Sequence, residues 1–446
     1  MHSLSVALFL EAIISLTSPV LAANNTTLSS STQAALAFER TLWANGSVLD
    51  DPWYSIEEST ASASAGTLLK LEKNTNTSLY TLPPATALSR FVYQSKTFNG
   101  SLVPASAYIL WPHTARSASD GYQVVAWAHG TSGSGPNCAP SHVKTLWNHY
   151  FAPFQLALQG YVVVGTDYAG LGISKDASGK DIIHEYLTGP SQASDIFYSV
   201  EAAQTAFPEL SKSFVIAGHS QGGGAAWAAA QRQAIEPVDG YLGAIAISPV
   251  TNFINLADQL SSLVAVAVAP SIQIMFPNFN VSDILTPDGV ERLALSQQIG
   301  GDTATTVSLL KGYQLTKPGW ENNPFVQNYQ NIVENGGKAI SAPLLVIHGE
   351  ADVTLGYNLT TAAVEKTAKL YPETSIEYVR VSGASHIGGM TSCQWLWMDW
   401  IAQRFQGVPA ESGLTNKELK APMPGLSYQI NQNWWVAPVT AFYQTS

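Results

Sequence analysis

The sequence has little charge. Asp, Glu, Lys and Arg make up only 12% of its 446 residues, and acidic residues outnumber basic ones, which gives a net charge of −11. Proteins that bind nucleic acid or an anionic membrane need a basic face, so this balance argues against nucleic acid as a partner. Hydrophobic residues make up 46% of the chain. Because disordered chains combine low hydrophobicity with high net charge, we expect a compact, folded protein.

The motifs of several large protein classes are also missing. The chain has no internal repeat, no Cys/His cluster with zinc-site spacing, no phosphate-binding P-loop and no dinucleotide-binding fingerprint. Each of these motifs supplies side chains or backbone groups that bind a particular metal or nucleotide. The sequence therefore indicates no cofactor.

The N-terminus, MHSLSVALFLEAIISLTSPVLA, has an apolar core followed by small residues and a cleavage position after Ala22. This pattern is typical of a secretory signal peptide, so we expect a secreted, extracellular protein. A buried or membrane-anchoring helix is the alternative, although the apolar run is shorter than the ~20 residues that a span needs. Sequons agree with secretion and predict N-glycosylation at Asn24, Asn25, Asn45, Asn76, Asn99, Asn280 and Asn358.

Cysteine is nearly absent. Cys138 and Cys393 are the only two in the chain. Two cysteines in a secreted protein favour a single disulfide between them, and two buried free thiols are the alternative.

Short apolar runs that end in glycine or polar residues recur along the chain: YQVVAWAHG, GYVVVGTDYAGLG, SFVIAGHSQGG, LGAIAISPV and APLLVIHGEAD. Strands buried on both faces of a parallel sheet have this composition. Helical stretches at 147–159, 190–206 and 222–234 lie between them. The alternation predicts a doubly wound, mostly parallel α/β sheet. RFVYQSKTFNG and SAYILWP alternate apolar and polar residues, which predicts a pair of antiparallel strands.

The chain divides into five segments. A signal peptide (1–22) precedes a Ser/Thr/Ala-rich arm (23–66) that we expect on the surface. The α/β core occupies 67–250 and 343–446. Between its two parts, 251–342 lacks buried-strand patterns and predicts a mainly helical cap over the sheet, with its apolar side available to a substrate. Additional core without contact to a ligand is the alternative for this segment.

The segment GHSQG fits the G-x-S-x-G nucleophile elbow, in which a serine sits on a tight turn between a strand and a helix. Gly218 and Gly222 lie two residues to either side of Ser220, where the chain crowds itself and a Cβ would clash. SFVIA before the motif and GGAAWAAAQRQA after it supply the strand and the helix. Ser220 is therefore predicted to be a nucleophile.

A serine nucleophile needs a base, and in this fold an acid and then a histidine follow the serine. Asp352 follows the strand APLLVIHG, and His386 follows the next strand, IEYVRV. Asp352 would orient His386, which would accept the proton of Ser220. Glu350 is the competing acid, whereas His348 is expected to be packed. The backbone N–H groups of Thr131 and Gln221 are assigned to an oxyanion hole, with the Thr131 side chain as a possible third donor.

With these residues in place, the chain resembles the α/β-hydrolases, and within them the fungal secretory lipases of the lipase-A type and related secreted esterases. The resemblance rests on DPWY at 51, WAHGTSGSGPNCAPS at 127, GYVVVGTDYAGLG at 160, GHSQGG at 218, HGEAD at 348 and GASH at 383. It implies carboxylic ester hydrolysis by Ser220, Asp352 and His386 without a metal, and a cap inserted before the acid-bearing strand. It implies that Asp167 and Tyr168 line or brace the pocket, to which we add His129, Gly130 and His219. The chain departs from lipase A in Gln221 and in having only two cysteines.

We therefore predict a secreted serine esterase or lipase that acts on short-to-medium acyl, acetylated or aryl esters. A serine peptidase on the same fold, a true long-chain triacylglycerol lipase and a catalytically inactive binding protein are the alternatives. The expected partner is a small-molecule or lipid ester, with transient contact to a lipid interface through the cap and no obligate protein partner.

Overall fold

The computed structural model describes residues 28–147, 152–256 and 258–428. The predicted signal peptide and the sequons at Asn24 and Asn25 lie outside these residues. None of the helices within these ranges is long and apolar enough to cross a membrane.

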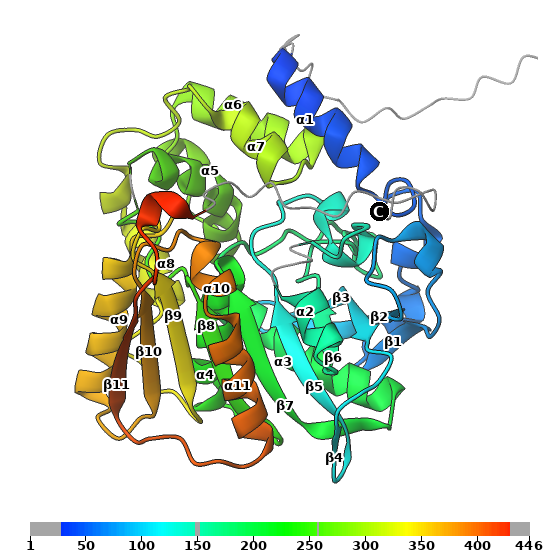
Figure 1. Cartoon of the computed structure of the whole chain (residues 1–446). Coiled ribbons are helices and arrows are strands. Elements are labelled where there is room, and N and C mark those ends of the chain that lie inside the picture. Colours follow the sequence, from blue (N-terminus) through cyan, green and yellow to red (C-terminus); the bar gives the residue numbers. More distant parts are fainter. Residues whose placement is uncertain (1–27, 148–151, 257, 429–446) are drawn as a thin grey trace, which may run out of the picture.

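A single sheet forms the centre of the molecule (Figure 1). In the described residues it has 11 strands in the order β1-β2-β3-β6-β5-β7-β8-β9-β10-β11, with β4 paired to β5. The strands are β1 (Leu68–Glu72), β2 (Ala87–Lys96), β3 (Leu102–Trp111), β4 (Ser117–Ala118), β5 (Gly121–Ala128), β6 (Val162–Thr166), β7 (Leu210–His219), β8 (Tyr241–Ile247), β9 (Leu344–Gly349), β10 (Ile376–Val381) and β11 (Leu414–Leu419).

The pairing of the strands confirms the predicted mostly parallel sheet. From β6 through β5, β7, β8, β9 and β10 to β11, neighbouring strands run parallel. The two alternating segments form β2 and β3, which pair antiparallel as predicted, and β1 and β6 continue the antiparallel pairing on either side.

Helices cover both faces of the sheet. Along β5, Val124 and Ala126 pack into one core with α3 (Gly189–Ala206), α4 (Gln221–Gln233) and α9 (Tyr357–Leu370). Val125 and Trp127 pack into a second core with α2 (Pro153–Leu158) and α11 (Gln394–Phe405). Successive side chains of a strand point to opposite faces, so a strand with helices on both faces is apolar throughout. Short α10 (Gly388–Thr391) precedes α11.

Between β8 and β9 the chain forms the helices α5 (Asp258–Met275), α6 (Pro287–Ile299), α7 (Thr303–Leu310) and α8 (Pro324–Val333). They have their own apolar core, to which α5 contributes Val264, Val268 and Ile272. In Figure 1, α5, α6 and α7 lie above the carboxyl ends of the parallel strands. Ligands bind at this end of open α/β sheets, so these helices cover the position where a ligand-binding site is expected.

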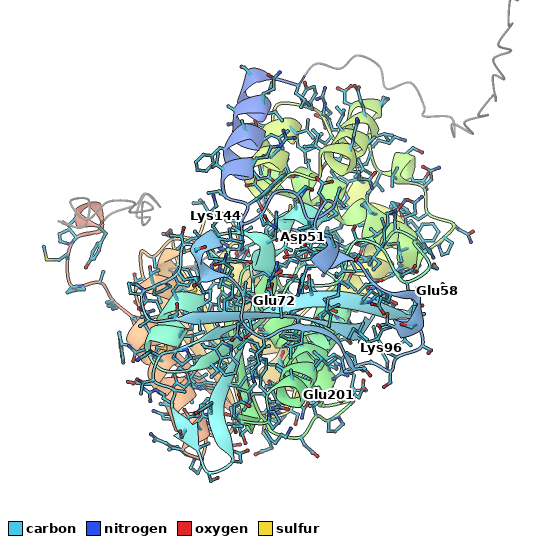
Figure 2. The ribbon with its side chains drawn as sticks, turned by 90° about the vertical axis from the view of Figure 1, so that its right-hand side faces the viewer. Asp51, Glu58, Glu72, Lys96, Lys144 and Glu201 are labelled. Atoms are coloured by element: carbon cyan, nitrogen blue, oxygen red, sulfur yellow. The ribbon has the colours of Figure 1, made fainter. Side chains whose placement is uncertain are left out.

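The N-terminal arm contains a helix, α1 (Ser30–Thr41), that the sequence analysis did not foresee. Helix α1 packs against α7, where Glu39 Oε2 accepts hydrogen bonds from Asp302 N (2.9 Å) and Thr305 Oγ1 (3.0 Å). Residues 42–66 of the arm lie against the antiparallel edge of the sheet, the side shown in Figure 2 with Asp51 and Glu72 labelled. There Arg90 pairs with Glu72 (2.6 Å) and stacks on the Trp53 ring (4.2 Å).

The predicted disulfide is not formed. Cys138 and Cys393 are both buried free thiols. The Cys138 thiol lies against Gly300 O, next to the cap, whereas the Cys393 thiol donates to Gly389 O in the core under α11. The two thiols therefore belong to separate packing clusters, and the alternative of two free thiols is the one observed.

Candidate active site

Ser220 stands on the strained turn that the motif predicts. It follows β7 directly, caps the start of α4, and has φ 59° and ψ −119°, which is unfavourable for a residue with a side chain. The turn needs glycine on both sides: a Cβ on Gly218 would lie 2.1 Å from Gly222 O, and one on Gly222 would lie 1.9 Å from Ala128 O. Such a turn persists only where tight packing enforces it, and it presents the serine at the carboxyl end of β7.

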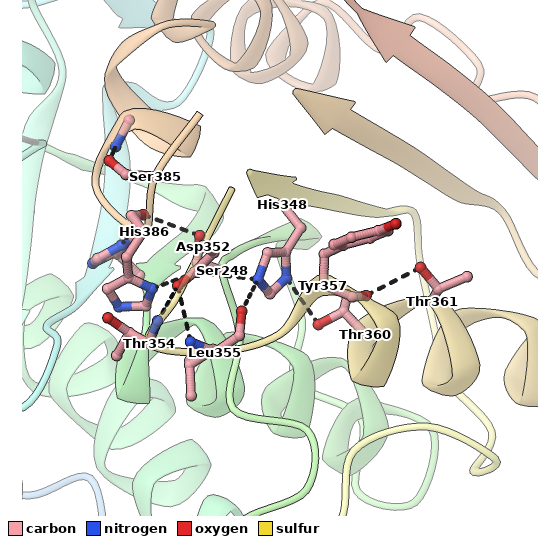
Figure 3. Close-up of polar contacts among 12 residues, drawn as sticks. Ser248, His348, Asp352, Thr354, Leu355, Tyr357, Thr360, Thr361, Ser385 and His386 are labelled. Atoms are coloured by element: carbon pink, nitrogen blue, oxygen red, sulfur yellow. Dashed lines mark hydrogen bonds and ion pairs between the residues drawn. The ribbon is translucent and has the colours of Figure 1, made fainter. Parts of the chain in front are cut away.

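The structure brings Asp352 and His386 together. Asp352 follows β9 and His386 follows β10, two neighbouring parallel strands. His386 Nδ1 lies 2.7 Å from Asp352 Oδ2 (Figure 3). Because an ionised carboxylate only accepts, Nδ1 carries the proton and Nε2 of a neutral His386 is left as the basic nitrogen. The competing acid, Glu350, instead pairs with Arg380 at 3.0 Å.

Asp352 is held in its ionised form. Burial alone would raise the pKa of this carboxyl, but hydrogen bonds from His348, His386 and Leu355 N outweigh burial and hold the pKa well below its usual range. Its second oxygen, Oδ1, accepts from Thr354 N and Leu355 N, both at 2.8 Å. The loop after β9 is thus wrapped around the carboxylate that orients His386.

His348 contacts the predicted acid, Asp352, which the sequence analysis did not foresee. Its ring is fully buried, and Nε2 lies 3.1 Å from Asp352 Oδ2 and 2.8 Å from Leu355 O, while Nδ1 lies 2.9 Å from Thr360 Oγ1. Predicting a packed histidine here was sound as far as burial goes. A possible signal was its position four residues before the acid, at the end of the same strand.

A cavity of about 350 Å³ joins Ser220 and His386 to the cap. Its volume lies near the lower end of the ~300–1,000 Å³ typical of small-molecule pockets. The wall from α5 is apolar, and α7 contributes a mixed wall. Among the described residues that line the cavity, none is acidic; they include Thr131, Tyr186, Leu256, Leu260, Leu263, Val264, Ala267, Thr303, Val307 and Leu310.

Of the two predicted oxyanion donors, Gln221 directly follows Ser220 in the chain, and Thr131 lines the same cavity as Ser220. Gln221 is the first residue of α4, so its N–H is one of the free donors of the helix N-terminus. Its side chain turns away toward His184, with Nε2 3.3 Å from the His184 ring. Thr131 lines the cavity, and its carbonyl accepts from Thr303 Oγ1 on α7 at 2.8 Å. Helix α7 therefore fixes the loop that carries Thr131.

His219 lines the cavity and contacts His386 directly. The two ring centroids are 4.6 Å apart, and His219 Nε2 donates to His386 O at 3.1 Å. Ser248 Oγ donates to the same carbonyl, also at 3.1 Å. Burial, reinforced by the neighbouring His386, lowers the pKa of His219 to about 3. A neutral His219 and Ser248 thus hold the backbone of His386 in place.

Of the other predicted pocket residues, only Gly130 lines the cavity. His129, Asp167 and Tyr168 are buried and do not line it, so bracing is the role that remains for Asp167 and Tyr168, and His129 is not a lining residue. His129 Nε2 lies 3.3 Å from Asp167 O, and Tyr168 OH donates to His129 O at 3.2 Å. The Asp167 carboxylate accepts from Ser106 and Ser141, and burial raises its pKa to about 6. These residues brace the loop that carries Gly130 and Thr131.

No hydrogen bond joins Ser220 to His386 within the described part of the chain. In free enzymes such bonds are often long and tighten only when substrate binds. No group of three or more His, Cys, Asp or Glu residues that could hold a metal is found among the residues that the structure describes.

The sheet order, the serine elbow and the Asp–His pair after successive strands define an α/β-hydrolase. A family profile described as serine aminopeptidase, S33, matches residues 149–386, more than half of the chain. The chain belongs to this family of hydrolases.

Solved structures with the same fold include two esterases or lipases. Candida antarctica lipase A in its closed state has a TM-score of 0.66 and 15% sequence identity, over 82% of this chain and 88% of that chain. The rice cell wall degrading esterase LipA from Xanthomonas oryzae has a TM-score of 0.59 and 19% identity, over 77% and 98% of the two chains. A search of curated protein sequences returns no match. At these identities the likeness establishes the fold.

Proposed function

We propose that this hydrolase cleaves carboxylic esters through a Ser220–His386–Asp352 triad. The observation that carries the proposal is that Ser220, on its strained elbow, and His386, bonded to Asp352, line one cavity. His386 Nε2 accepts the hydroxyl proton while Ser220 Oγ attacks the ester carbonyl. The N–H groups of Thr131 and Gln221 stabilise the oxyanion. His386 then protonates the departing alcohol, and water, activated by the same histidine, releases the acid.

The lining of the cavity supports an ester with a short-to-medium acyl group. The walls from α5 are apolar, and the volume of about 350 Å³ is small for a ligand pocket. Hydrolysis of p-nitrophenyl esters from acetate to palmitate tests this, with an optimum below the long-chain members as the expected result. A maximum at palmitate that requires an emulsion would make the protein a long-chain lipase instead.

A serine aminopeptidase is the second candidate, because the matching family carries that description. A peptidase that binds a free α-amine needs carboxylates near its serine, yet none of the described residues lining the cavity is acidic. Aminoacyl-p-nitroanilides should therefore be poor substrates. Rapid release of nitroaniline, abolished in Ser220→Ala, would establish the peptidase.

Labelling with a fluorophosphonate probe tests the nucleophile itself. The wild-type protein should label on one serine, and Ser220→Ala should neither label nor hydrolyse any ester. Ser199→Ala is a matched control, since Ser199 is a helical serine that lies outside the cavity lining and donates to Ile196 O. Equal labelling of the wild type and Ser220→Ala would refute the proposed mechanism.

Secretion and glycosylation complete the proposal. The sequon residues Asn45, Asn76, Asn99, Asn280 and Asn358 are all exposed, which supports access for the glycosylating enzyme. Expression in a eukaryotic host should deliver the protein to the medium with a mass that falls on endoglycosidase treatment. A product retained in the cell without glycans would contradict it.

Transient contact with a lipid interface through the cap is also proposed. Val307 lines the cavity from α7 and is 40% exposed, and Phe38 on the neighbouring α1 is 66% exposed. Val307→Ser and Phe38→Ser should both weaken sedimentation of the protein with neutral phosphatidylcholine vesicles. Phe38→Ser should leave hydrolysis of soluble esters intact, because Phe38 does not line the cavity. Absence of any sedimentation of the wild-type protein would contradict this contact.

A further inference from the structure

The hydroxyl groups of Tyr186 and Thr131 form a pair inside the cavity. Tyr186 OH lies 2.9 Å from Thr131 Oγ1, and both residues line the same cavity as Ser220. In such a pair one hydroxyl donates, and the hydrogen of the other is left for a further acceptor. The phenol is the more acidic group and the better donor. When Tyr186 donates, the Thr131 hydrogen is the one that remains available.

The backbone around Thr131 has little freedom. Its carbonyl accepts from Thr303 Oγ1 (2.8 Å), and Ser132 O accepts from Thr303 N (3.0 Å), so the N-terminus of α7 holds both peptides. An isolated antiparallel bridge between Gly133 and Asp302 continues this contact. With the backbone fixed, the direction of the Thr131 hydroxyl hydrogen is the main variable, and Tyr186 is the group that sets it.

Tyr186 is itself firmly placed. Its carbonyl accepts hydrogen bonds from Tyr329 OH on α8 (2.6 Å) and from Ser271 Oγ on α5 (3.4 Å). Its side chain is almost completely buried, and burial raises the pKa of its phenol. The phenol therefore stays protonated at neutral pH and can act as a donor. Two cap helices thus hold the backbone of Tyr186, and Thr131 is the partner of its hydroxyl group.

We propose that Tyr186 is a positioning residue that directs the Thr131 hydroxyl toward the oxyanion, making it a third donor beside the N–H groups of Thr131 and Gln221. This inference rests on the proposed esterase function. A donor that is already aimed at the developing charge needs no reorganisation during the reaction, so it stabilises the transition state more than the substrate. Losing the phenol oxygen should therefore lower kcat and leave KM nearly unchanged.

A double-mutant cycle tests the proposal. Tyr186→Phe removes only the phenol oxygen, Thr131→Val removes the hydroxyl and keeps the shape, and Thr131→Ser keeps the hydroxyl. We expect kcat to fall roughly tenfold in Tyr186→Phe and more in Thr131→Val, with Thr131→Ser close to the wild type. In the Thr131→Val background, Tyr186→Phe should cost nothing further, because the hydroxyl that it orients is gone.

A second readout separates positioning from packing. A trifluoromethyl ketone adds to the active serine and places an oxyanion in the hole, whereas a matching unreactive ketone occupies only the pocket. Tyr186→Phe should weaken binding of the former by about the same factor as kcat and leave binding of the latter unchanged.

Equal losses from Tyr186→Phe in both backgrounds, or an unchanged kcat, would overturn the positioning role. Wild-type protein that hydrolyses no ester would overturn the proposed function as well. Ester hydrolysis that depends on Ser220 but not on Tyr186 would overturn only the inference.

Discussion

His348 and His386 contact the same carboxylate oxygen of Asp352, and His348 Nε2 also lies 2.8 Å from Leu355 O. The distances to Asp352 Oδ2 are 3.1 Å from His348 Nε2 and 2.7 Å from His386 Nδ1. Figure 3 shows Asp352 between the two histidines, with His348 on the side of α9. Histidines therefore contact this carboxylate from both sides, and one of them, His348, does not line the cavity.

Removing this contact should slow the reaction without changing substrate binding. His348→Leu leaves Asp352 Oδ2 without its second histidine partner, so the carboxylate is held less firmly against His386 and kcat should fall roughly tenfold. His348→Gln, which places an amide donor near the position of Nε2, should recover part of the loss. Steady-state kinetics at saturating ester measure both; equal kcat values for the two variants would mean that His348 only fills space.

The identity of the acid can be decided with two isosteric changes. Asp352→Asn replaces the acceptor of His386 Nδ1–H by a group that favours the wrong tautomer, so kcat should fall roughly 10³- to 10⁴-fold. Glu350→Gln breaks only the partly exposed pair with Arg380 and should leave kcat within a factor of about two. Both proteins should show the wild-type circular dichroism. A large loss in Glu350→Gln with an active Asp352→Asn would reverse the assignment.

The sheet could be predicted because its strands are buried on both faces. The strands from β5 to β9 contain continuous apolar runs because both faces of the sheet are covered by helices. In β5, for example, Val124 and Val125 are buried against helices on opposite faces. The serine turn could also be predicted from the sequence, because Gly218 and Gly222 avoid steric clashes between residues that are close together in the chain. Features that depend on contacts between segments far apart in the sequence could not be predicted. Helix α1 is an example, since α7 supplies partners such as Asp302 for Glu39.

The same limit explains the errors around the site. Polar residues after parallel strands were correctly expected at one edge of the sheet, but the sequence does not tell which of them point into the cavity. His219 and Gly130 line it, whereas Asp167 turns inward to Ser106 and Ser141. The partner of His348 was hidden for this reason too. The disulfide failed because the number of cysteines gives no information on the distance between them.

Stability should depend on pH through buried neutral histidines. Burial, with Arg90 nearby, lowers the pKa of His142 to about 4, and burial also lowers the pKa of His129 and His184 to about 4. Their unfolded pKa is ~6.5, so between pH 6.5 and 4 the unfolded chain binds more protons than the folded one. These groups therefore contribute stability above pH 6.5 that is lost as the pH falls toward 4.

His142→Phe isolates one such group, since His142 lies outside the cavity and packs against the rings of Trp43 and Tyr54. The free energy of unfolding, measured in urea from pH 4.5 to 7, should vary less steeply in the variant, by up to about 1.4 kcal/mol per pH unit. The buried carboxyls of Asp167 and Asp195, whose pKa values burial raises to about 6 and about 7, act in the opposite direction in both proteins. Identical slopes would show that the pKa of His142 is the same in the folded and unfolded states.

The apolar wall from α5 should set the acyl-chain preference. Leu263→Ala and Val264→Ala enlarge the cavity and should move the optimum of the p-nitrophenyl ester series to longer chains, whereas Ala267→Phe should move it to shorter ones. Val268 lies on the same helix but in the core of the cap, so Val268→Ala should lower the melting temperature and leave the preference unchanged. A shift in Val268→Ala as large as that in Val264→Ala would mean that cap stability, not cavity shape, controls chain length.

The two cysteines should behave as unreactive thiols. Burial raises the pKa of the Cys393 thiol to about 12 and that of Cys138 well above its usual value, so little nucleophilic thiolate forms in the folded protein. A thiol reagent such as 5,5′-dithiobis-(2-nitrobenzoate) should therefore react slowly with the native protein and with two thiols per chain in guanidinium chloride. Dithiothreitol should leave the melting temperature unchanged, because no covalent link is there to be reduced. The opposite result would be a melting temperature that drops in reductant, together with no titratable thiol in the denatured protein. That result would mean that Cys138 and Cys393 are bonded to each other, which requires the loss of their contacts to Gly300 and Gly389.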